Sequence, residues 1–163
     1  MGNKTFERKI MHIVAFKILD REYGVNILQV REIIRSRRIT PIPEAASFIE
    51  GVIVLRGKVM PLVNLRKKLG IEAKALDKKS RIIIAQLEGH CAGMIVDEVS
   101  DVLSVDDGNI IAPDEALQEA KYLIGLVNIG KRLILLVDMI KLLSHEESVD
   151  VRKIYDRVEV RRP

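Results

Sequence analysis

The sequence predicts an all-β fold with short helices, arranged as two small antiparallel barrels. Short apolar runs rich in β-branched residues are separated by tight polar turns, and the same order of runs and turns occurs twice. Strands do not alternate with long helical segments, which argues against a parallel α/β sheet. The chain has 163 residues, 48% of them hydrophobic, and is therefore large enough to bury a core.

An internal repeat is the strongest of these observations. Two pairs of segments align, residues 13–35 with 82–104 at an offset of 69, and residues 51–69 with 125–143 at an offset of 74. Gly24 aligns with Gly93, and apolar residues coincide along both stretches. The five-residue difference between the offsets falls in the connectors 36–50 and 105–124, where insertions are tolerated. We infer an ancient duplication of one β-rich unit.

Each copy begins with a predicted β-hairpin. The runs HIVAFKIL and RIIIAQL are rich in β-branched residues, and each precedes a polar turn and a second strand. The apolar residues that follow change toward helical spacing, at Ile27, Val30, Ile33 and Ile34 in the first copy and at Val99, Val102 and Leu103 in the second. This spacing predicts a short helix after each hairpin, over residues 28–35 in the first copy.

The second half of each copy predicts another hairpin. The chain turns at Arg56-Gly57-Lys58 and at Gly130-Lys131-Arg132, and Asn64 or Asp138 is then a good N-cap for a closing helical turn. Pro61 has no N–H to donate, so we expect it on an edge strand or at a bulge. A fifth strand for each barrel is expected from each connector.

The composition excludes several function classes. The chain has no Trp, and its basic clusters adjoin predicted turns or helix ends, which argues against nucleic-acid binding. The single cysteine, Cys91, fits a reducing compartment. No apolar run approaches the length of a membrane span, and no signal peptide follows the basic residues near the start. We therefore expect a cytoplasmic protein that does not insert into a membrane.

The sequence offers no catalytic residue, metal site or cofactor site. Nucleophile, phosphate-binding, dinucleotide-binding and zinc motifs are absent from it. His90 and Cys91 are consecutive in a predicted strand, so they point to opposite faces and cannot readily share a metal. Asp97 and Glu98 are interpreted as a helix start, and Asp106 with Asp107 as a solvated turn. A small enzyme or ligand-binding barrel that uses the groove between the copies remains the alternative.

The positions at which the copies differ are candidates for binding. Arg56 follows an uncharged run and aligns with Gly130; it is either a solvated hairpin end or a guanidinium displayed for a partner. Val30, Ile33 and Ile34 cannot all face a core from one short helix. These differences favour a protein-binding function over a catalytic one.

Four ordered stretches carry a family resemblance: EYGVNILQVREII, FIEGVIVLRGKVMPLVNLRKKLG, CAGMIVDEVSDVLSV and YLIGLVNIGKRLILLVDMIKLL. Together they resemble the CheW family of bacterial chemotaxis coupling proteins. The resemblance covers a domain over residues 12–144, with two intertwined subdomains at about 13–69 and 82–143. Residues 1–11 are then an N-terminal tail, and residues 145–163 a C-terminal tail or a loosely docked helix.

The resemblance implies two five-stranded SH3-like barrels about a pseudo-twofold axis. It also implies a scaffold that joins chemoreceptor cytoplasmic tips to the regulatory domain of the histidine kinase CheA, with no cofactor. By motif position it assigns partner contacts to Val30, Glu32, Arg56 and Val102, with Gly57 as the turn that presents Arg56; we add Ile33 from its apolar character. Val54 stands where family members often have Asn, so the hydrogen bonding of that turn is expected to differ.

Overall fold

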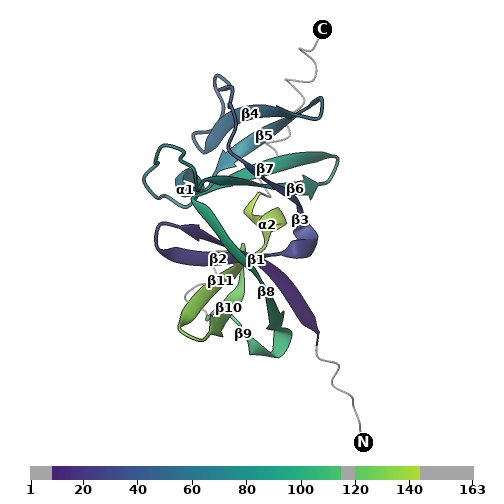
Figure 1. Ribbon diagram of the computed structural model, residues 1–163, viewed down its shortest axis with the longest axis vertical. Helices are drawn as coiled ribbons and strands as arrows, with labels where there is room; N and C mark the ends of the chain where they lie inside the picture. The colour runs from purple at the N-terminus through teal and green to yellow at the C-terminus, as the bar shows by residue number, and fades with distance from the viewer. Residues whose placement is uncertain (1–8, 115–119, 144–163) are drawn as a thin grey trace, which may run out of the picture.

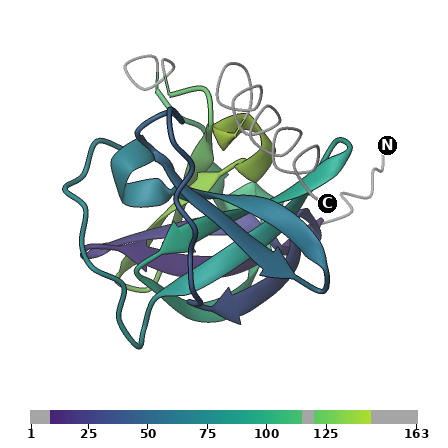
Figure 2. The same ribbon diagram turned by 90° about the horizontal axis from the view of Figure 1, so that it is seen from above.

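The computed structural model describes residues 9–114 and 120–143. Its eleven strands form two sheets that are stacked along the long axis of the molecule (Figure 1) and overlie each other when viewed along that axis (Figure 2). In the described residues, no helix is long and apolar enough to cross a membrane. The predicted C-terminal segment 145–163 and most of the predicted tail 1–11 lie outside the described residues.

Sheet A has six strands and sheet B has five. Sheet A runs in the order β8 (Glu98–Asp106), β1 (Ile10–Ile18), β2 (Arg21–Asn26), β11 (Arg132–Val137), β10 (Leu123–Ile129) and β9 (Ile110–Ile111). Sheet B runs in the order β3 (Val30–Arg35), β6 (Arg81–Leu87), β7 (His90–Val96), β5 (Lys58–Asn64) and β4 (Ile49–Leu55). The remaining elements are short: the 3-10 turns η1 (Ile27–Gln29) and η2 (Asp107–Asn109), and the helical turns α1 (Leu65–Lys68) and α2 (Met139–Leu142).

Both sheets contain strands from both copies of the duplicated unit. The first strand of each copy pairs with the third strand of the other, β1 with β8 and β6 with β3. The second strand of each copy pairs in parallel with the last strand of the other, β2 with β11 and β7 with β5. The prediction of purely antiparallel barrels is therefore wrong at these two joints, because the partner strands come from different copies and are not linked by a hairpin.

The strand registers repeat at the offset found in the sequence. Ile13 pairs with Asn26 in the first copy, and Ile82 pairs with Ile95 in the second. Gly24 and Gly93 also have the same surroundings, because a Cβ atom would lie 2.9 Å from Ile13 at one and 2.7 Å from Ile82 at the other. The structure confirms the duplication.

The predicted short helices are strands. Only Ile27–Gln29 forms a helical turn, and the following residues of each copy become β3 and β8. Exposed and half-buried residues alternate along β3, the period of a strand, and pairing with β6 satisfies the backbone groups on one side of it. Asp97 and Glu98 therefore do not begin a helix. The sequence predicted a fifth strand from each connector, but β3 and β8 take that place. In the described residues the connectors supply the short β9 and a bridge between Thr40 and Val52.

The second hairpins agree with the sequence except at Pro61. Asn64 caps α1 by accepting from the N–H of Lys67, and Asp138 caps α2 by accepting from Ile140 and Lys141. Pro61 lies inside β5, an interior strand, and the register of β4 and β5 is regular there. The expected edge or bulge is wrong because the parallel ladder with β7 begins only at Leu62.

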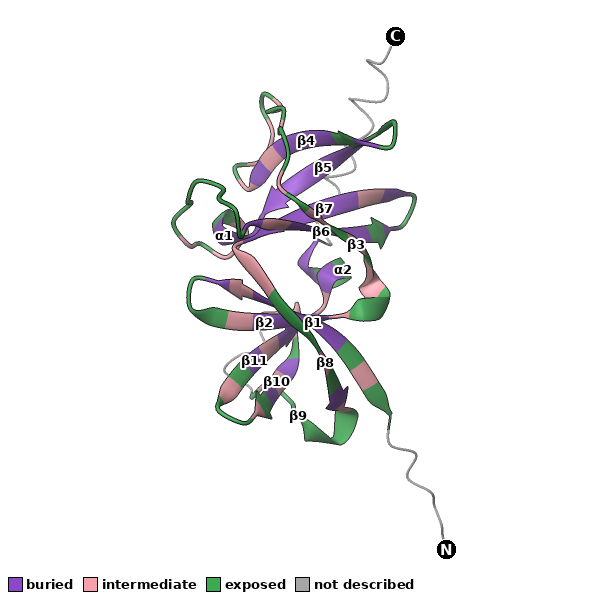
Figure 3. Cartoon of the chain, viewed as in Figure 1, coloured by how far each residue is buried: buried purple, intermediate pink, exposed green. Residues whose placement is uncertain are grey.

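Three apolar clusters hold the fold together (Figure 3). One cluster fills the interior of sheet A, and another fills the interior of sheet B. The third, which includes Val14, Ile83 and Met139, lies between the sheets. Ile82 and Ile84 face the interior of sheet B while Ile83 faces the cluster between the sheets, and all three are fully buried. Burial on both faces explains why β6 is a continuous apolar run rather than an alternating one.

Candidate functional site

The turn between β4 and β5 places Arg56 in a backbone conformation that side chains rarely adopt. Leu55 pairs with Lys58, so the turn has two central residues, Arg56 and Gly57, with φ angles of 51° and 75°. Two positive φ angles are the mark of the type I′ hairpin turn, which usually carries Asn-Gly. A long side chain at the first position is strained, and such strain is concentrated at functional sites.

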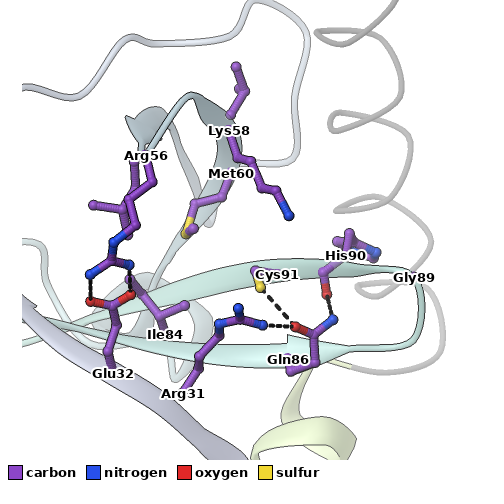
Figure 4. A pocket seen from close by; sticks show the side chains of 12 residues that line it. Arg31, Glu32, Arg56, Lys58, Met60, Ile84, Gln86, Gly89, His90 and Cys91 are labelled. Carbon is purple, nitrogen blue, oxygen red and sulfur yellow. Dashed lines mark hydrogen bonds and ion pairs between the residues drawn. The ribbon is translucent and has the colours of Figure 1, made fainter.

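Arg56 reaches across to β3 and binds the carboxylate of Glu32 through its two Nη atoms (Figure 4). Nη2 donates to Oε1 at 3.0 Å, and Nη1 donates to Oε2. The hydrogen bonds from Arg56 lower the pKa of Glu32, with a smaller opposing effect of desolvation, so the carboxylate stays charged. The Arg56 side chain is 70% exposed although its charge is paired, so its outer face remains open to a partner.

A cavity of about 270 Å³ lies beside this pair. Its walls come from sheet B and its turns, and they combine cations with apolar side chains. The lining residues are Arg31, Glu32, Leu55, Arg56, Lys58, Val59, Met60, Ile84, Gln86, Gly89, His90 and Cys91. Gln86 organises one wall, because its Oε1 accepts from Arg31 at 2.7 Å and from the Cys91 thiol at 3.1 Å. The cavity thus lies at the end of one sheet, and residues of both copies line it.

The structure brings together only part of the predicted site. Glu32, Arg56 and Gly57 are neighbours, and Val30 begins the same strand as Glu32 but packs against the cluster between the sheets. Ile33 is partly exposed on β3. Val102 lies apart from these residues on β8 of sheet A, where its side chain is 55% exposed.

Ile33 and Val102 occupy equivalent positions in the duplicated fold. Ile33 pairs with Ile83, and Val102 pairs with Val14 in the corresponding register. β3 and β8 are each the edge strand of their sheet. The predicted apolar contacts therefore mark the same position on two different sheets.

Two ion-pair clusters were missed by the sequence analysis. Arg66 binds Asp97, and Arg132 binds both Glu22 and Asp101. Each cluster joins residues of different copies, so its pairing depends on the exchange of strands and has no signal in local sequence. In the described parts of the chain, no group of three or more His, Cys, Asp or Glu residues is placed to hold a metal ion.

The sequence and structure were compared with known proteins. Residues 12–147 match the family model of the CheW-like domain. The chain is 39% identical to the chemotaxis protein CheW of Rhizobium meliloti, over 83% of this chain and 88% of that protein. It is 40% identical to the chemotaxis protein CheW of Klebsiella aerogenes, over 82% of each.

A solved structure is also similar. The crystal structure of the scaffolding protein TtCheW from Thermoanaerobacter tengcongensis aligns with a TM-score of 0.77 and 32% sequence identity, covering 90% of this chain and 96% of that one. These relatives are chemotaxis and scaffolding proteins. They confirm the resemblance, the all-β fold class and the prediction of a non-enzymatic scaffold.

Proposed function

Because the chain belongs to the CheW-like family, we propose that it couples chemoreceptor cytoplasmic tips to the regulatory domain of the histidine kinase CheA. Receptors control the kinase only when this adaptor joins them. The chain acts in the cytoplasm, close to the membrane through its receptor partner and without inserting into it, and nucleic acid takes no part. Residues 12–144 form the coupling domain, with the segments 1–11 and 145–163 outside it.

The observation that carries the proposal is the Arg56–Glu32 pair on a strained turn. An ion pair this exposed contributes little to folding. The left-handed conformation of Arg56 is itself unfavourable, so stability does not explain this residue. Arginine is enriched among residues that dominate interface affinity, and its fork can bind carboxylates or carbonyls. Glu32, Arg56 and Gly57 form one partner-binding surface.

A coupling protein also needs a second surface. The second surface contains Val102 on β8 of sheet A. Val30 and Ile33 supply apolar contacts on β3 of sheet B. Fully burying an exposed β-branched side chain contributes about 1.5–3 kcal/mol. The duplicated fold thus offers similar strand positions on two sheets, which two different partners can use.

Reconstitution tests the proposal. Kinase activity is measured with a receptor cytoplasmic fragment and CheA, with and without this protein, and receptor control is expected only in the complete mixture. Arg56→Glu is expected to weaken a partner contact about tenfold or more while the melting temperature changes by less than about 2 °C. Lys131→Glu is the matched control because Lys131 lies in the equivalent turn between β10 and β11. Receptor control that does not depend on adding the wild-type protein contradicts the proposal.

A further inference from the structure

The outer ends of the two sheets have equivalent positions that carry different chemistry. In sheet A, Arg132 donates to Glu22 on β2 at 2.7 and 2.8 Å and to Asp101 on β8 at 2.8 and 3.1 Å. One guanidinium thus pairs with two carboxylates and joins three strands. The alignment of the copies places Lys58 at the position of Arg132, Cys91 at that of Glu22, and Glu32 at that of Asp101.

The excess charge has the opposite sign in sheet B, where two cations, Arg56 and Lys58, accompany one carboxylate, Glu32. Glu32 is held by Arg56, which aligns with Gly130, and the position of the second carboxylate is taken by Cys91. Among the residues that the structure describes, none forms a hydrogen bond or ion pair with the Lys58 side chain. Figure 4 shows its amine beside the cavity, with no contact drawn to the other lining residues.

The charges around the cavity are therefore unequal. Arg31, Arg56 and Lys58 contribute three positive charges and Glu32 contributes one negative charge. Within the described ranges, the side chain of Arg31 is bound to the neutral amide of Gln86. Apolar side chains, including Met60 and Ile84, also line the cavity. Their low dielectric constant strengthens the attraction between an anion and the amine of Lys58.

We propose that this cavity binds the carboxylate of an Asp or Glu side chain from the protein partner, which pairs with Lys58. The inserted carboxylate supplies to sheet B the charge that Glu22 supplies to sheet A. The volume of about 270 Å³ is sufficient to admit one acidic side chain. The inference deepens the proposed function, because it rests on a partner docking beside Arg56.

A probe without the partner tests the site directly. The methyl NMR signals of Met60 and Ile84 in the full chain are followed during titration with N-acetyl-glutamate amide, and with N-acetyl-glutamine amide at the same ionic strength. The glutamate compound is expected to shift both signals in the wild type, and the glutamine compound to shift neither. Equal shifts from the two compounds, or no shift from either, overturn the proposal.

Two substitutions test whether Lys58 binds the carboxylate. Lys58→Met removes the cation, and Cys91→Glu restores within the chain the carboxylate that sheet A has at Glu22. Each is expected to abolish the glutamate-dependent shifts and to lower affinity for the partner about tenfold. Lys58→Arg keeps the charge and is expected to retain both. Cys91→Gln fills the same space without charge, so an effect equal to that of Cys91→Glu means that the cavity does not select a carboxylate.

The outcomes separate this inference from the proposed function. If the wild type binds the kinase regulatory domain or the receptor fragment and Lys58→Met binds it equally well, the carboxylate site is wrong and the coupling function stands. If the glutamate probe binds and neither protein partner does, the site stands and the coupling function is wrong.

Discussion

Arg66 and Asp97 join the closing turn of one copy to the end of β7 in the other through two contacts, Nε to Oδ1 at 2.8 Å and Nη2 to Oδ2 at 2.6 Å. Arg66 also donates to the carbonyl of Glu72, and Asp97 accepts from the N–H of Leu19. The two side chains are only 10% and 14% exposed. This mostly buried ion pair therefore holds the two copies together at this point.

We expect Asp97→Ala to lower the free energy of unfolding by about 3–5 kcal/mol, because it leaves a buried guanidinium without its counter-ion. Urea unfolding at neutral pH measures the change. Leu28→Ala is the control, since Leu28 aligns with Asp97 and is 88% exposed; a change within about 0.5 kcal/mol is expected. Equal losses in the two variants contradict a special role for the ion pair.

Acid is expected to weaken the end of sheet A. Hydrogen bonds from Arg132 are the main cause of the lowered pKa values of Glu22 and Asp101. A carboxylate whose pKa is lowered by folding contributes stability that is present above its unfolded pKa, about 4, and is lost as the pH falls through the folded value.

Arg132→Met is therefore expected to lose less stability than the wild type when the pH falls from 7 to 3. The free energy of unfolding is measured at both pH values for each protein. Lys131→Met, which changes the neighbouring residue in the same turn, should keep the acid sensitivity of the wild type. The prediction fails if Arg132→Met and the wild type respond alike.

The two aligned glycines should be equally intolerant of a methyl group. A Cβ at Gly93 would lie 2.7 Å from both Ile82 and Leu62, and one at Gly24 would lie 2.9 Å from Ile13. We expect Gly93→Ala and Gly24→Ala each to cost about 1–3 kcal/mol through overpacking. The nearest atom to a Cβ at Gly108 is at 3.5 Å, so Gly108→Ala should be nearly neutral in the same unfolding assay.

Val102→Asp is expected to weaken binding to the receptor fragment or the kinase regulatory domain at least about tenfold, because a charge replaces an exposed apolar contact. Isothermal titration with each partner measures the effect, and the melting temperature should hardly change. Leu133→Asp is the control, since Leu133 is 57% exposed on β11 and belongs to no assigned contact. Unchanged affinity for both partners removes Val102 from the site.

Local patterns predicted local features well. The aligned glycines and the N-caps Asn64 and Asp138 depend on neighbouring residues and have the predicted positions. The turns of the second hairpins lie within the predicted segments, at residues 56–57 and 130–131. The segment after η1 was misassigned because Val30, Ile33 and Ile34 fit a helical period over a short window, whereas pairing with β6 decides its conformation.

The candidate site was predicted only in part for a related reason. Arg56 was identified because its counterpart Gly130 lacks a side chain, but its bond to Glu32 depends on the two edges of sheet B, β3 and β4, coming together. Arg66 and Asp97 are 31 residues apart and meet only because the copies exchange strands. Contacts of this kind are set by topology, which a local pattern does not contain.

The exchange of strands also has an evolutionary consequence. A single unit has no complete sheet, since β1 needs the third strand of another unit and β2 needs its last strand. Two identical units could complete both sheets by exchanging the same strands between molecules, as a homodimer with two identical ends. In one chain the two ends are not bound by symmetry, and one carries Arg56 where the other carries Gly130.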